Sequence, residues 1–528
     1  MVMTPRHQVV IVGGGPVGVG LALDLGLRGV SCAVIERRPQ LSSIPKGQGL
    51  SQRTVEHFWS WGLVDELRAA RAMPTGHPIG QVTIYENLLS DFWHAPPARE
   101  LVAPFYFQAN ERLPQYRTEA VLRQRLADLP NVDMHVGWKA ISVEQDPDGV
   151  RVVMEKDGVQ EELEGEFVVG CDGGHSLVRE QADIARSGTD FDELVALVVF
   201  RSPELHEALK RFPDRSTYRV MHPDLKGYWK FFGRVDVGEE FFFHAPVPAG
   251  STVENFDFAG LLHQAAGFAF DCEIDHVGFW DLRVQVADVY RSGRAFIAGD
   301  AAHTHPPYGG FGLNNGLEDA VNLSWKLAAV LAGWGGDALL DSYSVERQAI
   351  FRDVGEDIIG GWIRDDRAFL EQYSPSVDRA EFERRFEEAA KGFGKRLRNF
   401  EPRYEGSPVV LGPPGGVISA HGEHTFTAQA GHHLPPQPLS WGSNVFEELG
   451  TGFTLLAFDA ESSAVEAFRE SAEVAGVPLT VVRDTAAGER AAYGARLVLV
   501  RPDQYVVWTG DVAPADPGHV LRTVTGRT

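Results

Sequence analysis

The stretch of sequence that decides the fold lies at the N-terminus, where residues 7–36 are HQVVIVGGGPVGVGLALDLGLRGVSCAVIE. The continuous β-branched run at 7–12 predicts a buried strand. Apolar residues at helical spacing over 17–29 predict a helix, and the apolar run at 31–35 predicts a second strand. A strand, a tight turn, a helix and a strand of these lengths form a βαβ unit with parallel strands. The sequence therefore predicts an α/β fold built on a parallel sheet.

A glycine fingerprint joins the first strand to the helix. Gly13, Gly15 and Gly18 are spaced Gly-x-Gly-x-x-Gly, which permits a tight turn and lets backbone N–H groups approach a pyrophosphate at the helix N-terminus. Glu36 ends the second strand, where its carboxylate can accept hydrogen bonds from both adenosine ribose hydroxyls but would repel a 2′-phosphate. The pattern predicts a Rossmann-like site for NAD or FAD, and disfavours both NADP at this loop and a turn that only packs helix on strand.

Length and charge limit the other possibilities. At 528 residues the chain exceeds a single hydrophobic core, which stops growing near about 250–300 residues, so we expect two or three domains. A formal net charge of −24 repels nucleic acid and anionic lipid, so neither is expected as a partner. The apolar run at 9–23 is interrupted by glycines and is too short to span a membrane. An anionic cofactor must therefore be held by a local device such as the glycine loop.

The three cysteines, Cys32, Cys171 and Cys272, lie far apart, without the spacing of a metal site or a disulfide framework. A reducing cytoplasm is the expected location. The histidines at 421, 424, 432 and 433 suggest a metal site, but their spacing is irregular and no cysteine accompanies them, so no metal is expected.

The rest of the chain predicts further domains. Buried-looking strands at 167–171 and 295–298 flank a region, about 194–288, in which aromatic and polar residues alternate as in an antiparallel sheet. A helical stretch, a Pro-, Gly- and His-rich segment and a compact α/β pattern follow. We expect a discontinuous nucleotide-binding domain over 1–185 and 285–400 with a helical extension over 338–400, an inserted substrate-binding sheet domain over 186–284 that could include 76–110, a linker over 401–440 and a C-terminal domain over 441–528.

A second glycine-rich pattern favours a flavin. Gly299-Asp300 follows a strand, and Gly310-x-Gly312-x-Asn314 precedes a helix. A simple NAD dehydrogenase needs no such element. A helix that starts at 312–314 would direct its positive end at the N1 and C2 carbonyl edge of an anionic reduced flavin, and Asp300 could bind the ribityl hydroxyls.

These motifs resemble those of the FAD-dependent aromatic hydroxylases, the single-component flavoprotein monooxygenases typified by p-hydroxybenzoate hydroxylase and phenol hydroxylase. The resemblance rests on the first fingerprint with Glu36, on Asp172-Gly173-x-x-Ser176-x-x-Arg179, and on residues 299–307, in the order of the family. It implies that Asp172 and Arg179 handle FAD and nicotinamide, and that Asp300 contacts the ribityl chain.

The resemblance also assigns single residues. Pro307 falls where the family places a backbone carbonyl beside flavin C4a, and Arg117 falls where a flavin-contacting Gln or Arg is expected. Lys46 stands where many members carry Arg, and Gln48 stands where some carry an acidic residue. The full set of residues expected to bind the cofactor is Gly13, Gly15, Pro16, Gly18, Glu36, Arg37, Lys46, Gln48, Arg53, Arg117, Asp172, Arg179, Asp300, Pro307, Gly310, Gly312, Leu313 and Asn314.

The C-terminal region resembles the thioredoxin-like tail of phenol-hydroxylase-type members. Residues 441–528 contain no cysteine, so thiol exchange cannot occur there. A structural or subunit-contact role is expected for this domain. The family also leaves a homodimer as one option for the oligomeric state.

The resemblance implies a mechanism. NADPH or NADH would dock transiently, since only one dinucleotide fingerprint is present, and would reduce FAD. O2 would then add at C4a, and the flavin hydroperoxide would transfer OH to an electron-rich aromatic ring in a site that excludes water. A phenolic substrate needs an acid/base partner. The candidate catalytic residues are Pro307, His222 and Tyr228, with Tyr218 as a further candidate and Arg219 or Arg234 for a substrate anion; each of these side chains other than Pro307 also fits a packing role.

Two alternatives stay open. The same flavin chemistry could serve epoxidation or Baeyer–Villiger oxygenation of a polyketide-like substrate. A different class of function, a flavin-binding scaffold without turnover, would keep the fold and lose the reaction.

Overall fold

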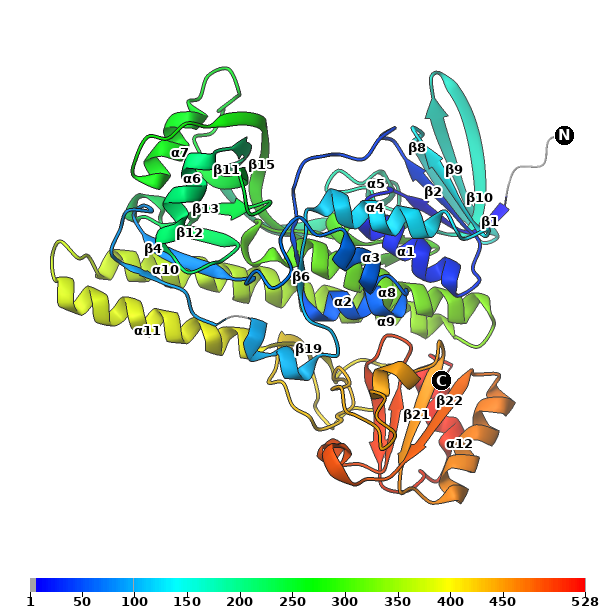
Figure 1. Ribbon diagram of the computed structural model, residues 1–528. Coiled ribbons are helices and arrows are strands. Elements are labelled where there is room, and N and C mark those ends of the chain that lie inside the picture. Colours follow the sequence, from blue (N-terminus) through cyan, green and yellow to red (C-terminus); the bar gives the residue numbers. More distant parts are fainter. Residues whose placement is uncertain (1–5, 98, 528) are drawn as a thin grey trace.

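The computed structural model describes residues 6–97 and 99–527. The N-terminal sheet has parallel strands in the order β17, β10, β1, β2, β7, with β16, β8 and β9 pairing antiparallel at its margins (Figure 1). The predicted βαβ unit is confirmed, with α1 (Pro16–Leu27) between β1 and β2. The strands are β1 (Arg6–Val12), β2 (Cys32–Glu36), β7 (Val132–Val136), β8 (Lys139–Asp146), β9 (Gly149–Lys156), β10 (Val159–Gly170), β16 (Arg291–Ser292) and β17 (Ala295–Ile297).

Helix α1 is apolar on all sides because protein surrounds it. It packs between α4 (Gln115–Leu126) and α8 (Phe311–Leu331). A Cβ on Gly316 of α8 would lie 2.6 Å from the Val17 side chain, so the glycine lets the first turns of the two helices lie side by side. Both helix N-termini therefore reach the same region of the molecule.

The second sheet has the order β18-β15-β11-β14-β13-β12-β4-β5 and is largely antiparallel. Residues facing one side of it form a core with α6 (Pro203–Ala208) and α7 (Phe258–Ala266). The opposite side is turned toward the first domain. Its strands are β4 (Gln81–Tyr85), β5 (Trp93–His94), β11 (Arg186–Arg201), β12 (Thr217–Met221), β13 (Trp229–Arg234), β14 (Glu240–Val247), β15 (Glu273–Ala287) and β18 (His303–Thr304).

Helices follow α8 over most of the next segment. They are α9 (Asp337–Arg352), a π-helical turn η7 (Asp353–Ile359), α10 (Gly360–Gln372) and α11 (Arg379–Arg398). Figure 1 shows α10 and α11 running side by side beneath the second sheet. The expected helical stretch is broken before Pro375, because a proline disfavours the helical conformation of the preceding residue.

The C-terminal domain is a small α/β unit with the strand order β22-β21-β23-β24, in the thioredoxin-like class expected from the sequence. Its elements are β21 (Phe453–Phe458), α12 (Ser462–Ala475), β22 (Leu479–Asp484), β23 (Leu497–Val500), β24 (Val506–Gly510) and α13 (Pro517–Val524). The segment before it differs from the aperiodic linker that was expected. It contains a two-stranded ladder of β19 (Phe400–Tyr404) and β20 (Ile418–His421), and several of its residues are buried.

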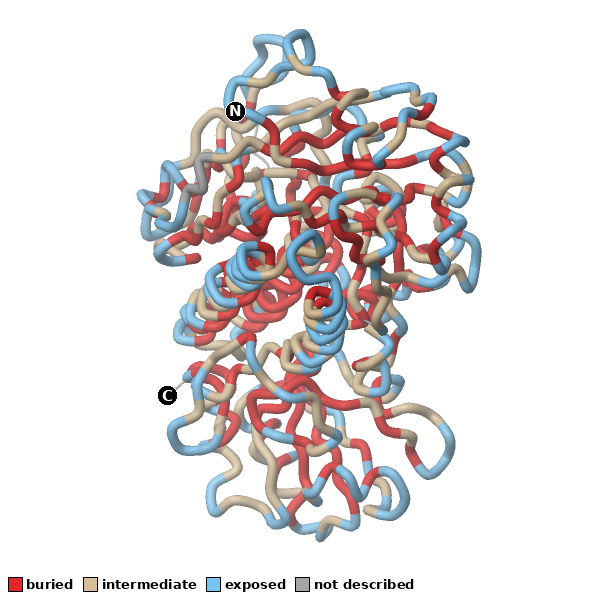
Figure 2. Tube along the Cα trace, turned by 90° about the vertical axis from the view of Figure 1, so that its left-hand side faces the viewer, coloured by how far each residue is buried: buried red, intermediate tan, exposed pale blue. Residues whose placement is uncertain are grey.

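A buried charge cluster joins the C-terminal domain to the helices. The carboxylate of Glu346 in α9 accepts hydrogen bonds from Arg501 Nη1 and Nη2, at 2.7 and 2.9 Å, and from Lys326 Nζ of α8 at 2.8 Å. These side chains are 0% exposed. Burial alone would raise the pKa of Glu346, but Arg501 and Lys326 hold it well below its usual range. Figure 2 shows buried segments on both sides of this junction.

We predict that Glu346→Ala destabilises the protein by about 3–5 kcal/mol, because the buried Lys326 loses its carboxylate partner and Arg501 keeps only Asp503. The free energy of unfolding from urea denaturation measures this. Glu381→Ala, on the surface of α11, is the control and should change stability far less, because exposed ion pairs contribute little. Equal effects of the two substitutions would contradict the assigned role of Glu346.

His432 forms a second buried contact in the segment before the C-terminal domain. Its Nδ1 lies 3.2 Å from a carboxylate oxygen of Glu401, and its Nε2 lies 3.0 Å from Glu405 Oε1. Burial alone lowers the pKa of His432, but hydrogen bonds and charge from the two carboxylates outweigh burial and raise the pKa.

Since the folded-state pKa lies above the unfolded value of 6.5, this contribution to stability is complete below pH 6.5 and is lost as pH rises through the folded pKa. We predict that His432→Gln lowers stability at pH 6 and flattens its fall above pH 6.5. Urea denaturation across this pH range measures both effects. The exposed His519→Gln should leave the profile of the parent protein unchanged.

Candidate active site

A cavity of about 980 Å³ lies between the first domain and the second sheet. Its wall includes the glycine loop, the start of α8 and the inner side of the second sheet. His433, which lies after the β19–β20 ladder, and Tyr505, which directly precedes β24, also line the cavity. Elements from distant parts of the sequence thus share one enclosed space.

The glycine loop is shaped by close backbone contacts. At Gly13, with φ +108°, a Cβ would lie 2.2 Å from the Cys171 carbonyl oxygen, and at Gly18 a Cβ would lie 1.9 Å from the Gly13 oxygen. Gly15 differs, because no atom lies within 4 Å of a Cβ built there, and this residue lines the cavity. It also begins α1 without a side-chain cap. The loop therefore presents backbone N–H groups to an open space that fits a pyrophosphate.

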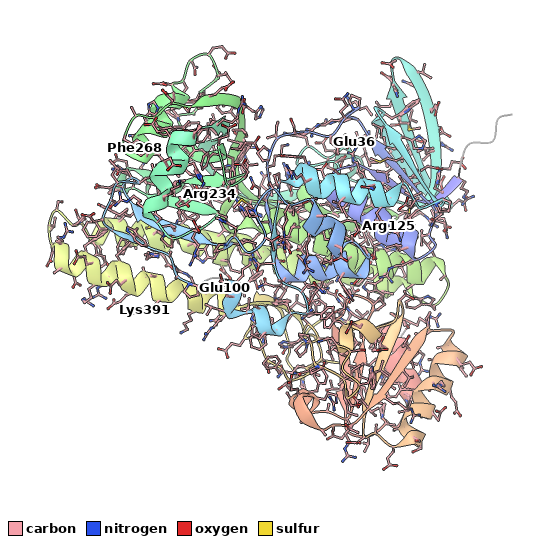
Figure 3. All side chains as sticks on the ribbon, in the orientation of Figure 1. Glu36, Glu100, Arg125, Arg234, Phe268 and Lys391 are labelled. Atoms are coloured by element: carbon pink, nitrogen blue, oxygen red, sulfur yellow. The ribbon has the colours of Figure 1, made fainter. Side chains whose placement is uncertain are left out.

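Glu36 lies beside this loop at the end of β2. Its Oε2 accepts from the Gly14 N–H at 2.8 Å and its Oε1 accepts from the Arg38 N–H at 2.7 Å. Arg123 of α4 donates to the Gly14 carbonyl at 2.7 Å. Neither Glu36 nor the exposed Arg37 is among the described residues that line the cavity. Figure 3 places Glu36 in the first domain, across the molecule from Arg234 of the second sheet.

Asp300 is enclosed by protein but exposed to the cavity, where Lys46 also contributes to the wall. Burial raises the pKa of Asp300, and Lys46 opposes this shift. Burial also lowers the pKa of Lys46, helped by the charge of Arg38. A carboxylate and an amine in this enclosed wall provide polar groups for hydroxyl-rich ligand atoms.

Asp172 and Arg179 are hydrogen-bonded to backbone groups next to the cavity wall. Asp172 accepts from the Leu177 N–H at 2.7 Å, and Arg179 donates to the carbonyls of Gly174 and Ala301, at 3.1 and 3.2 Å. Neither is among the described residues on the cavity wall, whereas Gly173 and Gly174 are. The Asp-Gly motif thus holds the backbone of the wall in place.

The start of α8 faces the cavity through Gly310, Gly312, Leu313 and Asn314, and Pro307 also lines it. The helix begins after Gly310, which has φ +68° and provides no side-chain cap. Its N–H groups and positive end are directed at the cavity. Asp300 and the start of α8 therefore share one cleft, as the flavin hypothesis requires.

The amide of Gln48 provides an independent test of whether a ligand fits. Gln48 is 5% exposed and lines the cavity, and neither its Oε1 nor its Nε2 has a hydrogen-bond partner among the described residues. A buried amide without partners is costly. A planar ligand with polar edges, such as a flavin, fits this side chain.

The expectation for Arg117 is corrected. Its guanidinium donates to the carbonyls of Ala70 and Arg71, at 3.1 and 3.0 Å, and Arg117 is not among the described residues on the wall. Gln115 lies there instead. Residues two apart on a helix point in nearly opposite directions, so only one of the two faces the cavity.

Arg53 lines the cavity, but its guanidinium is held by protein. It donates to Glu318 Oε2 at 3.1 Å, to Gln504 Oε1 at 2.6 Å and to the Asp503 carbonyl at 2.6 Å. The side chain connects α8 with the C-terminal domain. A direct flavin contact is not needed to explain it.

The candidates His222 and Tyr228 are also corrected. The His222 side chain caps a short turn by accepting from the Asp224 N–H, and Tyr228 is buried just before β13. Neither is among the described residues that line the cavity, whereas Trp229 and Phe231 are. The two faces of a strand alternate, and only the register shows which face is turned inward.

The two arginines expected to hold a substrate anion, Arg219 and Arg234, differ in where they lie. Arg219 lines the cavity, lies 4.2 Å from the centre of the Trp229 ring and forms an ion pair with Asp366 of α10. Arg234 is bonded to Tyr218 and His206 instead. Arg112, which sequence reasoning missed, lines the cavity and donates to the Arg234 carbonyl at 3.0 Å.

The histidines of the C-terminal segment have separate partners. His424 bonds Tyr106, His433 bonds Glu56, and His432 bonds the two glutamates described above. In residues 6–97 and 99–527 no group of three or more His, Cys, Asp or Glu side chains is arranged to hold a metal. Within the same ranges, no helix is both long enough and apolar enough for a membrane crossing.

The fold and the cavity define a flavoprotein of the monooxygenase class. Residues 6–357 match the family described as FAD binding domain, and residues 427–528 match the family described as aromatic-ring hydroxylase, C-terminal. The chain belongs to the FAD-dependent aromatic-ring hydroxylase family, and it is an FAD-dependent monooxygenase. A flavin scaffold without turnover is therefore disfavoured.

Two relatives and one solved structure are similar to this chain over nearly its whole length. The FAD-dependent monooxygenase apdD of Emericella nidulans is 30% identical over 95% of this chain and 87% of its own length. The tetracenomycin A2 monooxygenase-dioxygenase of Streptomyces glaucescens is 29% identical over 99% and 97%. The structure of aklavinone-11 hydroxylase with FAD and aklavinone is similar with a TM-score of 0.84, 27% identity, and coverage of 99% and 100%.

We predict opposite effects for two glycine substitutions. Gly13→Ala should destabilise the apoprotein, because a methyl group there meets the Cys171 carbonyl in a strained backbone. Gly15→Ala, where space is open, should leave apoprotein stability unchanged and weaken FAD binding about tenfold or more, because the methyl group occupies the cradle. Urea denaturation and FAD titration measure the two effects. Full FAD affinity in Gly15→Ala would contradict the assignment of the glycine loop as the pyrophosphate site.

Proposed function

We propose that this monooxygenase hydroxylates a phenolic, polyketide-type aromatic substrate with O2 and with NADPH or NADH as the reductant. The size and aromatic lining of the cavity carry the proposal. Trp229, Phe231, Phe242 and Trp280 provide flat faces for a fused-ring ligand. The relatives named for tetracenomycin A2 and aklavinone support the same substrate class.

FAD would lie along the cavity wall from the glycine loop to the start of α8. Gly15 and the N–H groups of α1 would bind the pyrophosphate, Glu36 the adenosine ribose, and Asp300 with Lys46 the ribityl chain. Gln48, Pro307 and the backbone at 312–314 would surround the ring system. When bound, FAD supplies the redox chemistry and the activation of O2.

The remaining task of the chain is to hold the aromatic ring and exclude water. Tyr505 and His433 close the cavity from the side of the C-terminal domain. His433 lies 2.8 Å from Glu56, and the Arg53 guanidinium lies 5.5 Å from the centre of the Tyr505 ring. These contacts hold His433 and Tyr505 in position. Excluding water keeps the activated oxygen from being released as hydrogen peroxide. The C-terminal domain would thus act in turnover without thiol chemistry.

The reductant would dock from outside the FAD site. The chain has one Gly-x-Gly-x-x-Gly loop of the strand-turn-helix type, and we assign it to FAD. Glu36 disfavours a 2′-phosphate at that loop but does not restrict a separate docking surface. NADPH and NADH are therefore both compatible with the proposal.

A panel of phenols tests the proposal. We expect a subset to accelerate NAD(P)H oxidation by the FAD-loaded protein and to yield a product heavier by one oxygen atom, detected by mass spectrometry, with the position of that oxygen assigned by NMR. Acceleration that yields only hydrogen peroxide, or a product with oxygen inserted into a ring carbon–carbon bond, would contradict ring hydroxylation.

Asp300→Ala tests the cofactor assignment. We expect about a 10–100-fold loss of FAD affinity, because a charged hydrogen-bonding group is removed from the wall. Glu36→Ala should reduce affinity less, since backbone groups of the loop still bind the pyrophosphate. Fluorescence titration of apoprotein with FAD measures both, with the exposed Glu161→Ala as the control. Unchanged affinity in Asp300→Ala would exclude the ribityl role.

A further inference from the structure

The inner face of the second sheet contains a histidine that sequence reasoning missed. His244 lies on β14, paired across the ladder with Leu197 of β11 on one side and Phe231 of β13 on the other. All three residues line the cavity. Their neighbours in sequence, such as Phe243 and Phe232, belong to the core on the opposite face. The strand register therefore turns His244 toward the substrate space.

Aromatic rings surround the imidazole. The Phe231 ring is stacked on it at 4.6 Å and 23°, while the rings of Trp280 and Phe242 approach edge-on at 5.0 and 5.4 Å. His244 is 3% exposed. Because it also lines the cavity, its small accessible surface is turned toward that space. The ring is thus held rigidly in one orientation.

One nitrogen of this ring, Nδ1, lacks a protein partner in the described part of the chain. Nδ1 is buried and has no hydrogen bond among the residues that the structure describes. Burial lowers the pKa of His244 to about 3, so the ring is neutral and carries one N–H donor and one acceptor nitrogen. Buried polar groups are nearly always hydrogen-bonded, so an unpartnered buried nitrogen calls for a partner that the protein chain itself does not provide. A ligand oxygen is the partner that the cavity can supply.

Two charged groups of the same wall have protein partners of their own. Arg219 is paired with Asp366, and Arg112 donates to the carbonyls of Arg234 and Ser216, while the buried Nε of each arginine has no hydrogen-bond partner among the described residues. Neither arginine is hydrogen-bonded to Nδ1 of His244. Its surroundings instead combine flat apolar faces with one neutral hydrogen-bonding group, which matches a hydroxylated aromatic ring.

We propose that the unprotonated nitrogen of His244 accepts a hydrogen bond from a hydroxyl group of the aromatic substrate and thereby selects phenolic rings over rings without a hydroxyl group. The aromatic neighbours bind the ring face, and the imidazole binds the hydroxyl edge. A ligand that cannot make this bond leaves a buried polar group unpaired, which gives strong discrimination. The inference rests on the proposed function for the identity of the substrate, but binding alone can test it.

Isothermal titration calorimetry of the FAD-loaded protein, without NAD(P)H, provides the test. The probes are 2-naphthol and its methyl ether, 2-methoxynaphthalene, which keeps the ring but cannot donate a hydrogen bond. We expect the parent protein to bind 2-naphthol about tenfold more tightly than the ether. His244→Phe, which keeps a flat ring without nitrogen, should reduce this ratio to about twofold or less.

Two further variants separate hydrogen bonding from packing. His244→Gln returns an amide donor and acceptor and should restore part of the preference for 2-naphthol. Phe242→Leu removes an aromatic contact of the same pocket and should weaken both probes alike, leaving their ratio unchanged. An unchanged preference in His244→Phe, or a parent protein that binds both probes equally or neither, overturns the proposal.

These binding results are distinguishable from a failure of the proposed function. If no phenol yields a hydroxylated product, a preference for 2-naphthol that disappears in His244→Phe still supports the recognition role. If hydroxylation occurs while the preference is independent of His244, the proposed function stands and this inference fails.

Discussion

Charged side chains buried along α8 connect every part of the molecule to the cavity. Glu318 is bonded to Arg53 and His57, the next residue, Asp319, to Arg347 and His303, and Lys326 further along to Glu346. Buried charges are tolerated only with well-placed partners. These contacts therefore set the position and rotation of α8, and with them the direction of its N-terminus, which faces the cavity.

The same helix explains how the C-terminal domain reaches the active site. Arg501 of the C-terminal domain is bonded to Glu346, which is also bonded to Lys326 of α8. Gln504, which lies close to Arg501 in the sequence, accepts a hydrogen bond from Arg53 on the cavity wall. Tyr505 is carried into that wall with them. A domain that contains no cysteine thus contributes residues to the cavity wall. The second sheet contributes the opposite side, with one face packed against α6 and α7 and the other left for the substrate.

Sequence reasoning was strongest where the backbone itself forms the site. The glycines at 13, 15 and 18, Asp300 and the start of α8 were recognisable because close backbone approach and helix termini demand particular residues at short spacing. It was weakest on the second sheet. His222 and Tyr228, which were chosen, lie just outside β12 and β13 and are not among the described residues on the cavity wall. His244 was missed, because only the strand register shows which face of β14 is turned inward. Arg117 was chosen and Gln115 was not considered, because the sequence does not show the rotation of that helix.

The amino-acid sequence by itself determined the βαβ unit, the family and the flavin, since these depend on local spacing that survives in a linear pattern. Only the tertiary structure decided which side chains meet inside the cavity. Trp229 and Phe231 of β13, His244 of β14 and Tyr505 just before β24 meet there, and their convergence depends on strand register and on buried ion pairs between residues that are distant in sequence. Long-range packing of this kind leaves no periodic signal in a single chain.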